Sequence, residues 1–248
     1  MPPRLLAPLG PLFLGPLFLG PLFLGPLLLV SSFGCGGASE ASAGPLRAAH
    51  PPGVQHGMHH RFEHPETWAP ELDAPERDAW QQPERVIEAL ALPPGAVVAD
   101  LGAGTGYFAV RLARAVPAGR VLALDLEASM VRYLADRAER EGLLNMLAGE
   151  STETDAGLRE TVDLVLVVNT YHHLADRTAY FERLRARLRG DGRVAILDFR
   201  LGSDRGPPRE HKIAPDVVQR ELEAAGYRLL EQHEFLTDQY FLVFGAAR

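Results

Sequence analysis

The apolar and polar positions from about residue 82 onward predict a regular alternation of strands and helices. The run at 162–168 is almost entirely apolar, which is typical of a strand in a parallel sheet with helices over both faces. Similar runs recur between segments that are polar or rich in glycine. The predicted strands are 97–100, 120–125, 143–148, 162–168, 192–199, 227–234 and 239–245. This alternation predicts an α/β fold.

Helices are predicted between these strands from apolar faces at helical spacing and from residues that favour helix ends. Pro83 and Pro215 stand where proline is favoured, in the first turn of a helix. Asp176 is suited to cap a helix that Gly190 stops, and the helix from Pro215 stops at Gly226. The pattern therefore provides the crossover helices that a parallel sheet requires.

The segment 97–107, VVADLGAGTGY, reads as a strand with an acidic end, a glycine-dense turn and the start of a helix. Glycines let a backbone approach a ligand closely, and the helix N-terminus directs free N–H groups at it. The G-x-G-x-G spacing differs from the dinucleotide fingerprint G-x-G-x-x-G, because Tyr107 stands where that fingerprint has glycine or alanine. Asp100 would repel a pyrophosphate, whereas it suits the zwitterionic head of S-adenosylmethionine (SAM).

The segment from Asp100 to Gly106 resembles the first motif of the class I, Rossmann-like, SAM-dependent methyltransferases, and the resemblance covers about residues 82–248. It implies a three-layer sandwich with a mostly parallel, seven-stranded sheet and one antiparallel strand near its edge. It also implies that the turn wraps the methionine part of SAM, with Asp100 supporting the amino group. The turn residues implicated are Gly102, Ala103, Gly104, Gly106 and Tyr107. The alternative is a tight strand-to-helix turn without a ligand.

Further cofactor contacts are expected at the ends of the following strands. Asp125 ends the strand 120–125, where a carboxylate binds ribose hydroxyls in nucleotide-binding α/β folds, and Leu126 would line the adenine. Asp125 is also suited to cap the next helix. The resemblance implies that Glu150 approaches the adenine amino group, although it also reads as a solvated loop carboxylate. Asn169 follows the fourth strand and should face the same site.

Methyl transfer from a sulfonium is an in-line displacement, so the protein mainly aligns the acceptor and excludes water. A hydroxyl or amine acceptor also needs a base. The candidate bases are His172, His173 and His211, with Asp198 as an orienting or basic carboxylate. Adjacent His172 and His173 should point in different directions, so only one of them is expected in the site. Each histidine also reads as a plain structural hydrogen-bonding group.

Composition restricts the partners. The formal net charge is −7, the isoelectric point is near 5.7 and Lys212 is the single lysine of the chain. Nucleic-acid binding requires a basic face, so a small-molecule methyl acceptor is expected rather than a nucleic acid. The roughly 200 residues beyond the N-terminal region are enough for one sizeable core. A single cysteine forms no intramolecular disulfide.

The N-terminal residues 1–35 resemble a signal-like leader of low complexity. Residues 10–25 repeat Gly-Pro-Leu-Phe-Leu, one cation (Arg4) precedes them, and Cys35 follows in an imperfect lipoprotein box. We therefore expect a membrane-anchored lipoprotein tethered through Cys35, and otherwise a cytoplasmic protein. The recurring prolines make a poor membrane-spanning helix. The alternative is a low-complexity extension that arose by repeat expansion.

Residues 36–55 read as a flexible linker, followed by a His-rich arm and lid at 56–82 and by the methyltransferase domain at 83–248. Four histidines lie within 56–64, but no acidic or cysteine cluster accompanies them, so we expect no metal. The alternative is a metal-binding arm that holds Zn, Cu or Ni. In the lid, Trp80 or Gln81 is expected either to contact SAM or to pack in the core.

Three functions from different classes remain open at this point. The sequence favours a SAM-dependent methyltransferase that moves a methyl group to an O, N or C acceptor, with SAM as cofactor. A nicotinamide-dependent oxidoreductase is disfavoured by Asp100 and Tyr107. A non-catalytic envelope lipoprotein that kept the fold would explain the leader, because SAM is made in the cytoplasm.

Overall fold

The computed structural model describes residues 64–247, which form a seven-stranded sheet in the order β3-β2-β1-β4-β5-β7-β6. β7 runs antiparallel to β5 and β6, while all the other neighbouring strands pair in parallel. The strands are β1 (Val97–Leu101), β2 (Arg120–Asp125), β3 (Met146–Glu150), β4 (Val162–Val168), β5 (Leu188–Phe199), β6 (Tyr227–His233) and β7 (Gln239–Ala246). The predicted sheet, with one antiparallel strand next to its edge, is confirmed.

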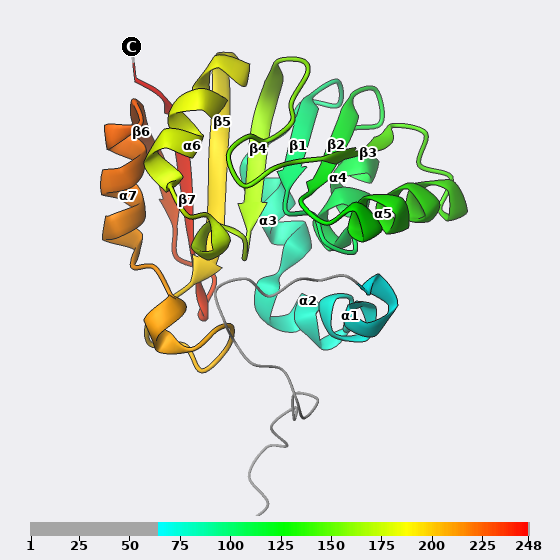
Figure 1. Cartoon of the computed structure of the whole chain (residues 1–248), viewed down its shortest axis with the longest axis horizontal. Coiled ribbons are helices and arrows are strands. Elements are labelled where there is room, and N and C mark those ends of the chain that lie inside the picture. Colours follow the sequence, from blue (N-terminus) through cyan, green and yellow to red (C-terminus); the bar gives the residue numbers. More distant parts are fainter. Residues whose placement is uncertain (1–63, 248) are drawn as a thin grey trace, which may run out of the picture. The chain divides into compact units, whose positions relative to one another are not determined.

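Helices cover both faces of the sheet, as Figure 1 shows. One hydrophobic core lies under α3 (Pro83–Leu90), α4 (Tyr107–Ala115) and α5 (Ala128–Arg140). A second core lies on the opposite face, under α6 (Arg177–Leu184) and α7 (Pro215–Ala224). β4 lies between them and is buried along its length apart from Asp163, as its apolar sequence predicts.

Two further segments lie beside the carboxyl ends of the parallel strands (Figure 1). The first is a helical lid of α1 (Pro65–Leu72) and α2 (Glu76–Gln81). The second is the connection from β5 to α7, residues 200–214, which contains the short helix η3 (Arg209–His211). Two more short helices are η1 (Tyr171–His173), which follows β4 after two residues, and η2 (Arg185–Arg187), which directly precedes β5. In open α/β sheets, ligands bind at this carboxyl edge.

Several element boundaries differ from the prediction. The third strand begins at Met146 instead of Leu143, because the Leu143 N–H still bonds the Ala138 carbonyl at the end of α5. The helix expected to continue to Gly190 ends at Leu184. Residues 185–187 continue as η2, and residue 188 already pairs with β4. Asp176 does cap α6, since its side chain accepts the Ala179 N–H at 3.2 Å.

Within residues 64–247, no helix is long and apolar enough to cross a membrane. The same residues contain no group of three or more His, Cys, Asp or Glu side chains that could hold a metal ion. The predicted leader with Cys35, the linker 36–55 and all the histidines of the arm except His64 lie outside the described residues.

Candidate functional site

The carboxyl edge of the sheet brings together polar residues that are far apart in the sequence. Asp100 lies near the end of β1, Asp125 ends β2 and Asp198 lies near the end of β5. Glu150 ends β3 directly beside Asp125, and Asn169 follows β4. Parallel pairing carries these strand ends to one side, so a single site can use all five residues.

The glycine turn between β1 and α4 requires glycine for both backbone and steric reasons. Gly102, Gly104 and Gly106 have φ angles of +73°, +56° and +93°, which L side chains rarely adopt. A Cβ at residue 106 would lie 2.9 Å from the Leu134 side chain, which is completely buried. The turn is also tied to β2, because the Gly102 and Ala103 N–H groups both donate to the Leu124 carbonyl.

Asp100 and Arg77 place opposite charges in one buried part of the site. Asp100 is 3% exposed, and burial raises the pKa of its carboxyl to about 7 against the opposing pull of the Arg77 guanidinium. Burial in turn lowers the pKa of Arg77 to about 10. An amino acid head group carries one charge of each sign, so this pair fits the methionine end of SAM. The sequence did not single out Arg77, because its closeness to Asp100 depends on how α2 packs.

Asp125 links the glycine turn to the start of α5. Its carboxylate accepts the Gly104 N–H at 2.8 Å and the Glu127 N–H at 3.0 Å, while burial raises its pKa. The N-cap residue of α5 is Glu127, and no side chain caps the helix, so Asp125 forms a turn just before the helix instead of the predicted cap. Ribose binding stays a prediction. Leu126 beside it is 52% exposed, an apolar surface suited to a planar base. Glu150 is also exposed, so its adenine contact stays a prediction too.

Tyr107 joins the lid to α4. Its side chain is 4% exposed, and the guanidinium carbons of Arg77 and Arg111 lie 3.9 and 4.1 Å from the centre of its ring. Its hydroxyl donates to Asp78 of α2, which also pairs with Arg111 at 2.8 Å. The Tyr107 ring thus contacts the lid, and a direct contact with the cofactor stays a prediction.

A second link holds the end of α1 over the glycine turn. The Asp73 carboxylate accepts the Thr105 hydroxyl at 3.1 Å and pairs with Arg137 of α5 at 3.0 Å. Arg137 also donates to the Thr105 carbonyl at 2.8 Å, and a Cβ at Gly104 would touch the Leu72 side chain at 3.7 Å. The lid therefore lies directly against the turn.

On the acceptor side, His172 and Asp198 form a buried pair. The His172 Nδ1 atom lies 2.9 and 2.8 Å from the two carboxylate oxygens of Asp198, and their side chains are 7% and 1% exposed. Asp198 also accepts the backbone N–H groups of His172 and Phe199. An ionised Asp198 can only accept, so Nδ1 carries the proton and Nε2 keeps its lone pair. This arrangement suits a general base.

The other predicted histidines are placed differently. His173 is exposed, and its ring centre lies 4.2 Å from that of His172. His211 ends η3, and its side chain makes no hydrogen bond or ion pair with another described residue. The Asp198 carboxylate orients His172, and catalysis by any of the three stays a prediction.

Asn169 is held by residues that the sequence did not connect with it. It adopts a φ of +55°, and its side-chain oxygen accepts a hydrogen bond of 2.5 Å from Gln239 of β7. Gln239 in turn accepts from Gln81 of α2 at 2.9 Å, so the lid reaches the end of β4 through side chains. The ring centres of Trp80 and Phe199 lie 5.9 Å apart, and a contact of Trp80 or Gln81 with SAM stays a prediction.

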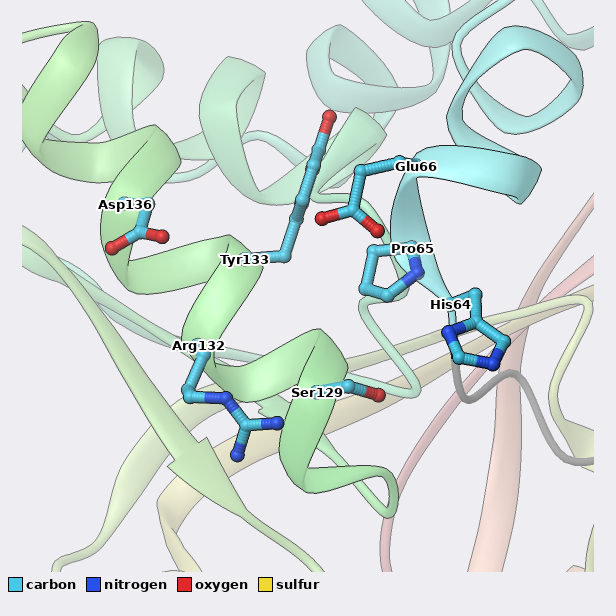
Figure 2. A pocket seen from close by; sticks show the side chains of 7 residues that line it. All are labelled: His64, Pro65, Glu66, Ser129, Arg132, Tyr133 and Asp136. Carbon is cyan, nitrogen blue, oxygen red and sulfur yellow. The ribbon is translucent and has the colours of Figure 1, made fainter.

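A separate hollow lies between α1 and α5 (Figure 2). It encloses about 320 Å³, and most of the side chains around it are polar. Its lining residues are His64, Pro65, Glu66, Ser129, Arg132, Tyr133 and Asp136. It contains none of the predicted catalytic or cofactor residues, so it is distinct from the site at the strand ends.

Comparisons with known proteins agree with this geometry. Residues 98–192 match the family model described as a methyltransferase domain. The ubiquinone/menaquinone biosynthesis C-methyltransferase of Hydrogenovibrio crunogenus is 31% identical over 116 residues, 46% of each chain. The erythromycin 3''-O-methyltransferase of Saccharopolyspora erythraea is 30% identical over 156 residues, 60% of this chain and 50% of that one. The chain thus spans about half the length of these curated relatives.

A solved SAM-dependent methyltransferase from Aquifex aeolicus matches with a TM-score of 0.70 and 28% identity, covering 74% of this chain and 99% of that one. The sheet order, the glycine turn and the opposite charges beside it fit the same kind of protein. Residues 98–192 are therefore a methyltransferase domain, and the described chain has the class I, Rossmann-like, SAM-dependent methyltransferase fold.

Proposed function

We propose that this protein is an enzyme that transfers a methyl group from SAM to an O, N or C atom of a small molecule. The observation that carries the proposal is the Asp100 carboxylate, which is buried at a glycine turn of methyltransferase type and lies within the electrostatic influence of the Arg77 guanidinium. A nicotinamide dinucleotide would instead bring its pyrophosphate to this turn, beside the Asp100 carboxylate.

The chain's own residues divide into two groups in this proposal. Asp100 and Arg77 hold the amino and carboxylate groups of the methionine end, Asp125 holds the ribose hydroxyls, and Leu126 packs on the base. When bound, SAM supplies an electrophilic methyl group on a sulfonium. The lid excludes water from the site and keeps the methyl acceptor aligned for in-line attack.

His172 removes the proton from a hydroxyl or amine acceptor in this mechanism. The His172 Nε2 lone pair accepts that proton, and the resulting imidazolium is stabilised by Asp198 at 2.8 Å from Nδ1. Asp198 also fixes the ring, because it bonds both the His172 side chain and its backbone N–H.

A small-molecule acceptor is supported by the acidic chain, with a formal net charge of −7. Some similar proteins are named for other substrates, including a probable ribosomal RNA methyltransferase and a release factor glutamine methyltransferase. The aromatic pair Trp80 and Phe199, between the lid and the end of β5, favours an apolar small molecule.

Calorimetric titration of the full chain with SAM, S-adenosylhomocysteine and NAD tests the proposal. We expect micromolar dissociation constants for both adenosyl ligands, no binding of NAD, and loss of binding in Asp100→Ala. Asp216→Ala is the matched control, since that carboxylate lies exposed on α7 and pairs only with Arg220 among the residues described. Binding of NAD without SAM would support the oxidoreductase instead.

We also propose that residues 1–35 act as a lipoprotein leader and tether the chain to a membrane through Cys35. The order of cation, apolar run and cysteine supports this. Radiolabelled palmitate should label the full chain in cells but not a Cys35→Ser variant. An unlabelled, fully soluble chain that binds SAM would show that the enzyme works without this anchor.

A further inference from the structure

A chain of side-chain hydrogen bonds runs from the lid to the end of β4. The Arg77 Nε–H donates to Gln81 Oε1, Gln81 Nε2 donates to Gln239 Oε1 at 2.9 Å, and Gln239 Nε2 donates to Asn169 Oδ1 at 2.5 Å. Both glutamines are 0% exposed. We call these four residues the amide relay. It joins α2, β7 and the turn after β4, which are distant in the sequence.

The direction of the amide relay is dictated by Arg77. A guanidinium only donates hydrogen bonds, so Gln81 must turn its oxygen toward Arg77 and its NH₂ group toward Gln239. Gln239 must then present its oxygen to Gln81 and its NH₂ group to Asn169. Each side-chain amide has one accepting end and one donating end. The donor and acceptor roles of every residue in the amide relay therefore follow from that of Arg77. The Asn169 side-chain oxygen therefore accepts the hydrogen bond from Gln239, and the Asn169 NH₂ group remains available to donate to a partner outside the amide relay.

The outward end of the amide relay lies beside the catalytic pair. Asn169 is partly exposed while both glutamines are buried, and its backbone N–H donates to the Leu197 carbonyl, next to Asp198. Its φ of +55° is a backbone conformation that asparagine tolerates better than most residues. η1, with His172, begins two residues later. Asn169 therefore lies at the carboxyl end of β4, three residues before His172, in the region where the acceptor is expected.

A donor at this position suits an oxygen acceptor better than an amine. The attacking oxygen has two lone pairs, of which one attacks the methyl carbon and the other accepts the Nδ2 hydrogen bond. A neutral amine has one lone pair and cannot use it for both purposes. The ammonium and sulfonium groups of SAM, next to the reacting methyl group, are cationic and gain nothing from an N–H donor.

We propose that the amide relay makes Asn169 Nδ2 an obligatory hydrogen-bond donor to the methyl acceptor and thereby selects a hydroxyl, phenol or enol oxygen. The inference rests on the proposed function and names its substrate class. In the reaction, the acceptor O–H proton moves to His172 Nε2 and the oxygen forms the new O–CH₃ bond. The C–S bond breaks, and its electron pair stays on sulfur as the thioether of S-adenosylhomocysteine.

Two near-isosteric variants test the direction of the amide relay in the full chain. Asn169→Asp keeps an oxygen for Gln239 but replaces the outward donor with an acceptor. Gln239→Glu, when ionised, only accepts, so it forces Asn169 to turn its NH₂ group inward. Gln219→Glu is the matched control, because Gln219 bonds only Glu223 on the exposed side of α7 among the described residues.

Turnover is measured with SAM and a panel of phenols, with 2-aminophenol as the internal competition between oxygen and nitrogen, and products are identified by mass spectrometry. We expect O-methylation by the parent chain and at least a tenfold loss of kcat/KM in both relay variants, with the dissociation constant of SAM within twofold. N-methylation of 2-aminophenol, or unchanged activity in Asn169→Asp, would overturn the proposal. A loss of SAM affinity in Asn169→Asp would place the donor on the cofactor and also overturn it.

A readout without turnover decides the direction of the amide relay if no phenol is a substrate. Side-chain amide NMR of the full chain bound to S-adenosylhomocysteine should show slow hydrogen exchange for Gln81 and Gln239 and fast exchange for Asn169. In Gln239→Glu, the Asn169 NH₂ group should become protected. The reverse pattern in the parent chain would refute the proposal, whereas absence of S-adenosylhomocysteine binding would refute the proposed function itself.

Discussion

The two halves of the site are built in different ways. The cofactor half is mostly local, because Asp100, the glycine turn and Tyr107 lie within eight consecutive residues, and backbone N–H groups tie the turn to β2. Arg77 of the lid and Asp125 of β2 are its members from elsewhere in the sequence. The acceptor half is assembled from three separate segments: Asn169 and His172 follow β4, Asp198 lies in β5 and Gln239 lies in β7, where the lid contacts it. The cofactor half, the local half, tolerates little change in its backbone. The acceptor half, the assembled half, can change its substrate specificity through substitution of a single side chain.

The largest expected effect lies in the acceptor half. His172→Gln removes the base but keeps a polar side chain of similar length, so kcat should fall by about 10²–10⁴-fold for a hydroxyl acceptor. The dissociation constant of SAM should stay within twofold, because no cofactor contact is expected from this side chain. Steady-state kinetics at saturating SAM, together with calorimetry, measure both quantities. A weakened SAM affinity with unchanged kcat would place His172 in the cofactor half.

The local half was largely predictable from the sequence, and the reason is physical. Positive φ angles require glycine, so the turn leaves a signature at fixed spacing. Buried parallel strands likewise leave apolar runs, and β2 and β4 have the predicted bounds. Leu143 and Leu188 were placed in the wrong elements, because an apolar residue at an element boundary suits either side.

The assembled half was only partly predictable. Strand ends point to Asp198 and His172, since topology alone brings them to one edge. Gln239 leaves no such signal, because its role depends on the packing of α2 and on the register of β7 against β5. Arg77 of the cofactor half leaves none either, because it reaches Asp100 only through the packing of α2. A buried polar residue with a distant partner can be recognised only once the partner's position is known.

The next prediction breaks the local half through its backbone. Gly106→Ala should destabilise the fold by about 1–3 kcal/mol, because alanine is strained at this φ and its Cβ would meet a buried leucine. Thermal unfolding of the full chain measures the change. Gly202→Ala is the control, since a Cβ there meets nothing within 4 Å and its φ is ordinary. Equal losses in the two variants would contradict the steric argument.

A third prediction concerns pH and again separates the halves. The raised pKa of Asp100, about 7, means that the folded protein binds a proton there that the unfolded chain releases near pH 4. The contribution of Asp100 to the free energy of unfolding therefore falls as pH rises from about 4 to 7, because in this range the native state binds more protons than the unfolded state. The ionised carboxylate is the form that holds an ammonium, so SAM affinity should instead rise about tenfold between pH 6 and 8.

Calorimetry at a series of pH values tests whether SAM affinity rises with pH while the stability of the fold falls. Asp100→Asn should abolish the pH dependence of SAM affinity in this range, and should also flatten the stability curve. The His172→Gln variant is the comparison from the acceptor half and should retain the SAM profile. If His172→Gln flattens the SAM profile and Asp100→Asn does not, the titrating group belongs to the acceptor half.

The smallest effect is expected where the lid closes over the local half. Asp73→Asn keeps an acceptor for Thr105 but removes the charge that faces Arg137, whose side chain is 16% exposed. A partly exposed ion pair contributes about 0.5–1 kcal/mol, so the SAM dissociation rate should rise only two- to five-fold in stopped-flow experiments. Asp216→Asn removes an equal charge from an ion pair whose two side chains are 64% and 68% exposed, and it should leave that rate unchanged. Equal rates in both variants would show that this link does not hold the lid, and closure would then depend on Tyr107 and the amide relay.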